Sequence, residues 1–305
     1  MNQRIGVIDI GTNTLLLLIA ERNAAGAIVP VVDECRFGRL GKGLDASGEL
    51  ALSSMADSLA ICHEYRALLD QHDIAAPTVI ATQAMREARN AAAFVEPAEA
   101  ILRAPLQVIA GDREAALAAA SVRGALPQLH GQRYIVVDVG GGSTEFIVTD
   151  GTRIETAVSV PVGAVRMTER FLLGDPPTTA QRTALDDFLA STLAALQLPV
   201  GLTMVGTAGT ATTLAAVQLQ LNIYSADKVT GLTLAPSQLQ ALCERIATAT
   251  VSERKTWPGM VAQRADVIAG GTAILHAAVK AAQAANFVVC DRGIRWGMAT
   301  ELLTS

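Results

Sequence analysis

The sequence has few of the residues that mark specialised classes of protein. Aromatic residues make up only 4% of its 305 residues, so we expect an aliphatic core built mostly of Ala, Val, Leu and Ile. Its four cysteines and four histidines are scattered, and no Cys/His metal motif can be built from their local spacing. Scattered cysteines are typical of free thiols in a reducing compartment, so we expect a cytoplasmic protein.

The sequence also lacks an apolar run of membrane-spanning length. Asp9 interrupts the apolar stretch near the N-terminus, so we expect neither a signal peptide nor a membrane partner. The net charge of −5 argues against a generally basic surface for nucleic acid, although a local positive cleft is compatible with it. The chain is long, and 50% of its residues are hydrophobic, which is enough for two domains of ordinary size.

Two short stretches, VIDIGTNTLLLL and VVDVGGGSTEFIV, share one pattern. In each, an apolar strand carries an acid near its end, a polar turn follows, and a second apolar strand begins. The aligned residues are Asp9 with Asp138, Gly11 with Gly140, and Thr14 with Ser143. We expect hairpins over 4–20 and 134–148, each continued by a third strand, at 27–32 and 153–160.

Helical and strand patterns alternate after each hairpin. In the first half we expect helices over 47–69, from Thr82 onward and over 112–126, with strands at 77–81 and 106–109. In the second half we expect helices over 163–173, 179–197, after 210, over 236–249, over 264–283 and from Arg292, with strands at 202–205 and 286–290. This order predicts a duplicated α/β unit with a boundary between Gly124 and Gly131.

Turns of this composition can bind an anion. Glycine lets the backbone approach a ligand closely, and successive N–H groups with Ser or Thr hydroxyls can converge on phosphate. A carboxylate beside phosphate is repelled unless a cation lies between them, so Asp9 and Asp138 suggest Mg²⁺, which prefers oxygen ligands. A single such turn is more often an ordinary hairpin, because Gly, Asn, Ser and Asp dominate turns. Two in register favour a polyphosphate held by both, although neither is a Walker loop or a dinucleotide motif.

A third glycine-containing turn, GTAGT at 206–210, joins a strand to a helix instead of to another strand. That geometry presents a helix N-terminus to an anion or a nucleotide. Close packing of the helix on the strand explains the same glycines equally well.

Further stretches extend the likeness along the chain. ATQAMREARN, VIAGDREAALAAA, SVPVGAVRMTERF, VGTAGTATTLAAV, RADVIAGGTAIL and VCDRGIRWGMATEL follow in order between Ile5 and Leu302. With the two phosphate-type turns, they resemble the exopolyphosphatase and guanosine pentaphosphate phosphohydrolase family, within the actin, sugar-kinase and heat-shock-chaperone superfamily. The resemblance implies a short member of the family, without the C-terminal helical domains of longer relatives.

The resemblance implies an α/β fold of two ribonuclease-H-like domains with an active cleft between them. The first would comprise residues 1–125 with the last helix, 295–305, and the second residues 126–294. The implied phosphate-binding residues are Gly11, Thr12, Asn13, Thr14, Arg86, Gly140, Gly141, Gly142, Ser143 and Thr144. The implied metal ligands, for Mg²⁺, are Asp9, Asp138 and Glu145. The implied nucleotide- or substrate-binding residues are Gly206, Gly209, Thr210 and Arg264.

Glu114 matches the position of the catalytic base in this family. A carboxylate there could deprotonate a water for in-line attack on a terminal phosphoryl group. Taken alone, it is better explained as an acid in the first turn of a helix, stabilised by ~0.3–1 kcal/mol through the helix dipole. Its neighbour Arg113 stands where many relatives have an acid, and Trp296 stands where a charged residue is expected.

The function expected is exopolyphosphatase activity, the Mg²⁺-dependent hydrolysis of terminal phosphate from inorganic polyphosphate. The alternative of the same class is removal of the 5′ terminal phosphate of guanosine pentaphosphate (pppGpp). Two other classes stay open: a kinase that transfers phosphate from ATP to a hydroxyl, and a non-catalytic (p)ppGpp sensor. The family habit suggests a homodimer, with no nucleic-acid partner.

Overall fold

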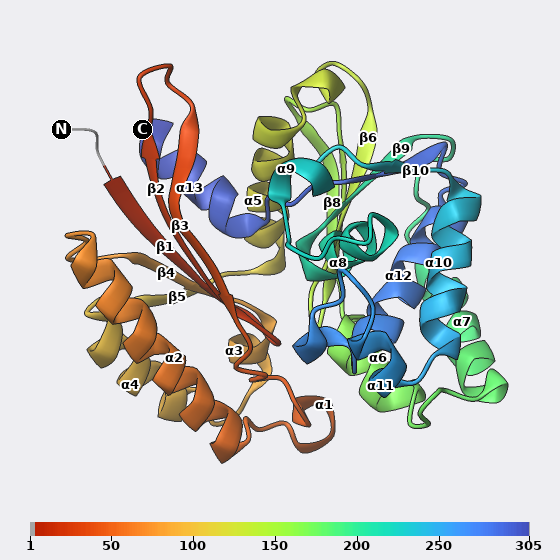
Figure 1. The fold of residues 1–305 in the computed structure, drawn as a ribbon, viewed down its shortest axis with the longest axis horizontal. Coiled ribbons are helices and arrows are strands. Elements are labelled where there is room, and N and C mark those ends of the chain that lie inside the picture. Colours follow the sequence, from red (N-terminus) through yellow and green to blue (C-terminus); the bar gives the residue numbers. More distant parts are fainter. Residues whose placement is uncertain (1–3, 305) are drawn as a thin grey trace. The chain divides into compact units, whose positions relative to one another are not determined.

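The computed structural model describes residues 4–304 as two compact units, each built of strands and helices (Figure 1). Unit 1 contains residues 4–121 and 294–304, and unit 2 contains residues 122–293. The chain leaves unit 1 within α5 (Gly111–Ala125) and returns to it at α13 (Ile294–Thr304). Unit 1 is therefore discontinuous in sequence, whereas unit 2 is a single continuous segment.

Unit 1 is built on a five-stranded sheet with the order β3-β2-β1-β4-β5. Its strands are β1 (Arg4–Ile10), β2 (Leu15–Arg22), β3 (Ile28–Arg36), β4 (Thr78–Ala81) and β5 (Leu106–Val108). The first three run antiparallel to one another, while β4 lies parallel to β1, and β5 lies parallel to β4. Long apolar runs in β1 and β2 suit strands that are covered on both faces.

The helices of unit 1 lie on both faces of this sheet. They are α1 (Leu44–Ser47), α2 (Leu52–Gln71), α3 (Gln83–Glu87), α4 (Ala92–Leu102), α5 and α13. Ile8, Ile10 and Leu17 pack with Tyr65 of α2 and Phe94 of α4 in one apolar cluster. α13 packs against β1 and β2, and side chains alternate along a strand. Asp9 therefore points to the face away from that cluster.

Unit 2 repeats this architecture with one added strand. Its strands are β6 (Tyr134–Val139), β7 (Thr144–Thr149), β8 (Ile154–Val160), β9 (Thr203–Thr207), β10 (Thr233–Leu234) and β11 (Asn286–Val289). The sheet order is β10-β11-β9-β6-β7-β8, with β7 and β8 antiparallel and β9 parallel to β6. The five strands β8-β7-β6-β9-β11 thus have the same order and directions as those of unit 1. The sheets bear out the duplicated unit that the sequence predicts.

The helices of unit 2 fill the connections between these strands. They are η1 (Pro127–Leu129), α6 (Ala164–Phe171), α7 (Thr179–Ala194), α8 (Ala208–Gln218), α9 (Ala226–Val229), α10 (Pro236–Thr248), α11 (Val251–Lys255), η2 (Ala262–Arg264) and α12 (Ile268–Ala281). Ile135, Val137 and Val139 of β6 pack with Leu189 of α7 and Ile274 of α12 in the main core. Asp138 alternates with these residues, so it points to the opposite face. Among residues 4–304, no helix is both long and apolar enough to cross a membrane.

Candidate active site

The two polar turns identified in the sequence close in the same way. In the turn of residues 11–14, the N–H of Gly11 donates to the carbonyl of Thr14 over 2.9 Å. In the turn of residues 140–143, the N–H of Gly140 donates to the carbonyl of Ser143, also over 2.9 Å. The sequence alignment of the two turns thus corresponds to one backbone conformation in both units.

A loop behind the 11–14 turn fixes the direction of its peptide groups. The carbonyl of Thr12 accepts from the N–H of Gly41 over 2.7 Å, and the carbonyl of Asn13 accepts from the N–H of Arg39 over 3.0 Å. In a planar trans peptide, the C=O of one residue and the N–H of the next point in opposite directions. The N–H groups of Asn13 and Thr14 therefore point away from this loop, where an anion could approach them.

The 140–143 turn is supported from behind by the start of α6. The carbonyl of Gly140 accepts from the N–H of Ala164 over 2.9 Å, and that of Gly141 accepts from the N–H of Val165 over 2.8 Å. By the same peptide geometry, the N–H groups of Gly141 and Gly142 point away from α6. In both turns, two successive N–H groups thus point away from the segment that hydrogen-bonds to the turn.

Thr144, predicted to bind phosphate, is fully buried at the start of β7. Its hydroxyl donates to the carbonyl of Val162 over 2.6 Å, so it ties the 140–143 turn to the segment before α6. The structure assigns this hydroxyl a structural contact. In the same region, a side chain at Gly163 would overlap the backbone of Gly141 and Gly142, so close approach explains this glycine.

The two predicted acids occupy equivalent places beside the turns. Asp9 is the penultimate residue of β1, Asp138 is the penultimate residue of β6, and both are buried. Asp138 lies directly opposite Glu145 of β7, so the two side chains lie on one face of the sheet. Burial raises the pKa of Asp138 to about 6, although the Thr207 hydroxyl next to it acts in the opposite direction.

A buried pair of facing carboxylates suits a hard cation. Glu145 is also buried and accepts a hydrogen bond from the Ser159 hydroxyl over 2.7 Å. Like charges directly opposite each other destabilise a sheet, and carboxylate oxygens are the ligands that Mg²⁺ prefers. Among residues 4–304, no group of three or more His, Cys, Asp or Glu side chains could hold a metal ion. The two carboxylates on one face of the unit 2 sheet could hold only an ion that takes its other ligands from water or phosphate.

Glu114 and Arg86 are brought together in unit 1 from different elements. Glu114 lies in the first turn of α5 and is buried, and Arg86 reaches its carboxylate from α3 in an ion pair. The same Nη1 of Arg86 donates to the carbonyl of Ile109 over 2.5 Å. Arg86 thus bridges the carboxylate and the segment that precedes α5, an arrangement that a solvated helix face does not explain.

The junction of β9 and α8 lies beside Arg264. Arg264 Nη1 donates to the carbonyl of Gly209 over 2.8 Å and to the hydroxyl of Thr213 over 2.9 Å. A side chain at Gly209 would overlap the guanidinium group. Gly206 instead faces the ring of Phe287, so close packing explains this glycine. Ala208, between them, has a φ of 61°, a strained value for a residue with a side chain, which sequence reasoning missed.

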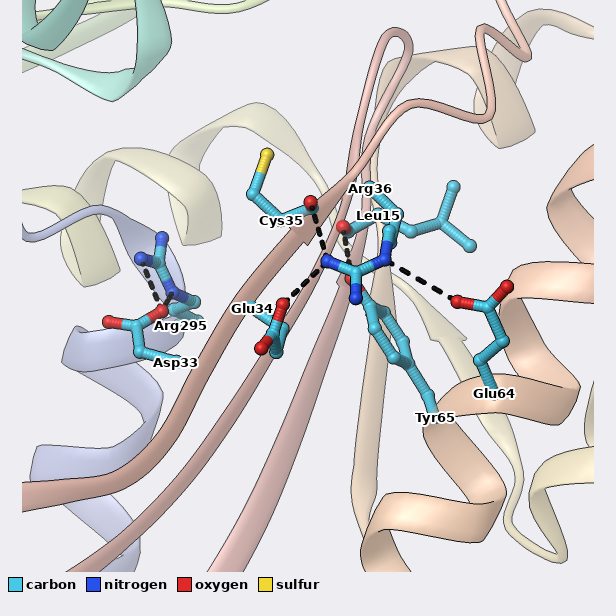
Figure 2. Close-up of polar contacts among 8 residues, drawn as sticks. All are labelled: Leu15, Asp33, Glu34, Cys35, Arg36, Glu64, Tyr65 and Arg295. Atoms are coloured by element: carbon cyan, nitrogen blue, oxygen red, sulfur yellow. Dashed lines mark hydrogen bonds and ion pairs between the residues drawn. The ribbon is translucent and has the colours of Figure 1, made fainter. Parts of the chain in front are cut away.

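Trp296 is buried, and its Nε1 donates to Asp33 Oδ2 over 3.3 Å. Arg295 donates to the other carboxylate oxygen of Asp33 over 2.8 and 3.1 Å (Figure 2). Nearby on β3, Arg36 forms ion pairs with Glu34 and Glu64. The contacts of Arg295 and Trp296 with Asp33 attach the start of α13 to β3. The hydrogen bond from Nε1 explains the indole at position 296.

The comparisons with known proteins agree on one family. The sequence matches the Ppx/GppA phosphatase family over residues 18–305. It is 35% identical to exopolyphosphatase 2 of Mycobacterium tuberculosis over 287 residues, 90% of this chain and 89% of that protein.

Two solved structures are similar over nearly the whole chain. One is an exopolyphosphatase from Cytophaga hutchinsonii, with a TM-score of 0.90, 27% identity and coverage of 99% of this chain and 98% of that one. The other is the Ppx/GppA family member of Aquifex aeolicus, with a TM-score of 0.84, 30% identity and coverage of 100% and 99%. These likenesses confirm the expected fold class.

Proposed function

The chain belongs to the Ppx/GppA phosphatase family, and we propose that it is an exopolyphosphatase that hydrolyses the terminal phosphoanhydride bond of inorganic polyphosphate. The observation that carries the proposal is the matched pair of turns, each with outward amides and a buried acid beside it. In each unit, two successive outward N–H groups suit the oxygens of a phosphate group. The reaction is the release of one orthophosphate and a chain shorter by one unit.

Hydrolysis adds one water across the terminal P–O–P bond. A new bond forms between the water oxygen and the terminal phosphorus, and the bond from that phosphorus to the bridging oxygen breaks. The bridging oxygen leaves with the electron pair as part of the shortened chain. We assign Glu114 to accept the proton of the attacking water, because a buried carboxylate in a helix first turn can be held in one orientation.

Arg86 has two roles in this proposal. In the free protein its guanidinium group pairs with Glu114, which holds the carboxylate in place. A terminal phosphate offers the same guanidinium group a stronger, bidentate partner. When phosphate binds Arg86, the Glu114 carboxylate is released toward the water that it must deprotonate. Substrate binding and formation of the free base are thus coupled through one ion pair.

Magnesium completes the proposed site. In unit 2 we assign Asp138 and Glu145 to hold it, together with water and phosphate oxygens, and in unit 1 we assign the same kind of role to Asp9. A bound Mg²⁺ would offset the charge of the polyphosphate. In unit 1, Arg86 and the outward amides of the 11–14 turn would orient the terminal phosphate, and Glu114 would move the proton. Chelation by EDTA should therefore abolish phosphate release, and added Mg²⁺ should restore it.

The proposal is tested by measuring released phosphate with short polyphosphate, long polyphosphate and pppGpp. We expect release from polyphosphate by the wild-type protein and none above background by Glu114→Ala. Glu99 on α4 offers a matched control, because it is also a glutamate of unit 1 and its carboxylate accepts from the Leu106 N–H. Glu99→Ala should keep the activity. Equal rates from wild type and Glu114→Ala would refute the assignment of the base.

A second candidate substrate is pppGpp, and one observation favours it. Arg264, Thr213 and the Gly209 carbonyl form a polar cluster at the start of α8, where a base or ribose could bind. Arg264→Ala should then raise KM for pppGpp and leave KM for polyphosphate unchanged. Equal effects on both substrates would exclude a nucleotide-specific role for this cluster.

The same assay separates the other classes. Phosphate transfer from ATP to a hydroxyl acceptor without simple hydrolysis would indicate a kinase. Tight (p)ppGpp binding without turnover in Mg²⁺ would indicate a sensor. The homodimer suggested by the family and the cytoplasmic location expected from the cysteine pattern belong to this proposal too, and sedimentation and cell fractionation test them.

A further inference from the structure

The first turn of α5, which carries Glu114, is attached to the C-terminal helix by an ion pair. Arg113 Nη1 donates to Glu301 Oε1 over 2.9 Å, and Arg113 Nη2 donates to Glu301 Oε2 over 2.5 Å. Two parallel hydrogen bonds from one guanidinium group to one carboxylate restrict both distance and orientation. Arg113 is therefore paired with Glu301 in the described structure.

A second contact fixes the two helices side by side. Gly297 of α13 lies so close to the carbonyl of Leu117 of α5 that a side chain there would overlap it. Arg113 and Leu117 are one turn apart on α5, and Gly297 and Glu301 are one turn apart on α13. The partners follow in opposite order, so the helices run antiparallel over at least this turn. Of these two contacts, the one between Arg113 and Glu301 lies nearer to the start of α5.

The other end of α13 is fixed to the sheet of unit 1. Arg295 and Trp296, in its first turn, both donate to the Asp33 carboxylate of β3, and Figure 2 shows the contact from Arg295. α13 thus contacts β3 at one end and α5 further along. Through these contacts the start of α5 is held at a set place relative to the sheet that carries Asp9.

The start of α5 needs such support. The first N–H groups of a helix have no intrahelical partner, so the first turn is the part that opens most readily. This helix also begins at Gly111, which has more backbone freedom than any other residue. Glu114 lies within that turn, one residue after Arg113. A small shift of the turn moves the carboxylate relative to the water that it would deprotonate.

We propose that Arg113 and Glu301 are positioning residues, whose ion pair holds the first turn of α5, and with it the Glu114 carboxylate, in the catalytic geometry. The inference rests on the proposed function for the role of Glu114. Both partners act through the α5 backbone and touch no reacting atom. The partners are 188 positions apart in the sequence, so no local motif reveals the pair.

The test compares single and paired substitutions at these two positions. Glu301→Gln and Arg113→Gln should each lower kcat roughly tenfold, the scale expected for a misplacement below 1 Å, with KM changed less than about twofold. The exchanged pair Arg113→Glu with Glu301→Arg should recover most of kcat. Arg113→Glu alone places two acids together and should be the least active variant.

A second ion pair in unit 1 serves as a control that distinguishes an effect on the position of Glu114 from an effect on the stability of the whole protein. Arg4 and Glu21 form another two-bond pair in unit 1, with bonds of 2.8 and 3.0 Å and side-chain exposures of 38% and 25%. Arg113 and Glu301 are each 41% exposed. Exposed pairs add little to global stability, so Glu21→Gln and Glu301→Gln should both leave the melting temperature almost unchanged. Only Glu301→Gln should lower kcat.

Hydrogen–deuterium exchange of the free protein gives a readout that needs no substrate. Glu301→Gln should speed exchange of the hydrogen-bonded amides of residues 114–117, and the exchanged pair should restore their protection. Unchanged exchange, or a kcat within twofold of wild type, would overturn the inference. So would a loss of kcat that merely follows the melting temperature. A wild-type protein that releases no phosphate would overturn the proposed function instead, and the exchange data would still decide whether the pair holds the turn.

Discussion

The substitution Asp138→Asn removes a buried charge without changing the size of the side chain, and we expect it to stabilise the protein at neutral pH. Asp138 is buried at the end of β6, and burial raises its pKa to about 6 from an ordinary value of 3.8. A site that must hold a charged acid for a cation is strained when no cation is bound. The variant should therefore gain stability and lose activity together.

The raised pKa of Asp138 gives both the sign and the size of its effect on the free energy of unfolding. A group whose pKa is raised on folding binds its proton more tightly in the folded state. Its favourable contribution is complete below pH 3.8 and is lost as the pH rises through 6. A shift of roughly 2 pKa units, at about 1.4 kcal/mol each, means that ionised Asp138 costs about 3 kcal/mol above neutral pH. Asparagine carries no such cost.

The measurement is urea unfolding in EDTA at about pH 7.5 and again at about pH 4, for wild type and variant. We expect the free energy of unfolding of Asp138→Asn to exceed that of wild type by about 3 kcal/mol at the higher pH, and the excess to shrink strongly at the lower pH. Saturating Mg²⁺ should reduce the excess by stabilising only the wild type.

An exposed aspartate of the same unit provides the control of opposite sign. Hydrogen bonds from the Arg153 N–H and from Thr152 lower the pKa of Asp150 to about 2. Asp150 therefore contributes stability at neutral pH that is lost on acidification, so Asp150→Asn should destabilise slightly or not at all. If Asp138→Asn is no more stable than wild type at neutral pH, or if its advantage persists at acid pH, the reasoning about the buried charge is wrong.

Three further outcomes are expected. Glu114→Gln should lower kcat for phosphate release about 10²–10⁴-fold, the range for loss of a general base, with little change in KM in saturation curves. Gly163→Ala would place a methyl group against the backbone of Gly141, so KM for polyphosphate should rise in the same assay. Gly297→Ala would force Leu117 and α13 apart, and urea unfolding should show a loss of about 1–3 kcal/mol. A wild-type value of kcat for Glu114→Gln would contradict its role as the base. Wild-type values of KM for Gly163→Ala or of stability for Gly297→Ala would contradict the close contacts of these glycines.

The sequence was most informative where its pattern was local. The alternation of apolar residues around Asp9 and Asp138 and the polar turns that follow predicted both hairpins, and the structure has them at β1–β2 and β6–β7. Aligning the two stretches also predicted the repeat, which the matching strand orders confirm. Such features depend on residues close together in the chain, so a single sequence contains the necessary information.

Element ends were less predictable. β3 continues through Asp33 to Arg36, a polar stretch without apolar alternation. Pro30 in this strand is tolerated because β3 lies at the sheet edge, beside a shift in register at Ile19 and Ala20. The helix expected from 264 begins only at Ile268, because a 3₁₀ turn ends at Arg264 and directs its guanidinium group to Gly209.

The role of a single residue depends on which other residues it contacts in the fold. The sequence could suggest Arg86 and Glu114 separately, but their ion pair joins two elements and depends on the fold. The same is true of Arg113 with Glu301, which lie 188 positions apart in the sequence. Gly206 shows the reverse case, since a motif that suggested a ligand is explained here by the Phe287 ring. Contacts between residues far apart in the sequence determine the roles of such residues, and the sequence around each residue does not reveal those contacts.

The discontinuity of unit 1 has a consequence for biosynthesis. Unit 2 is continuous and can fold as soon as its own residues have left the ribosome. The sheet of unit 1 emerges first but lacks α13, whose residues are translated only after all of unit 2. Nascent chains stopped before Ile294 would thus lack the helix that packs on β1 and β2, so unit 1 can complete its packing only after all of unit 2 has been translated.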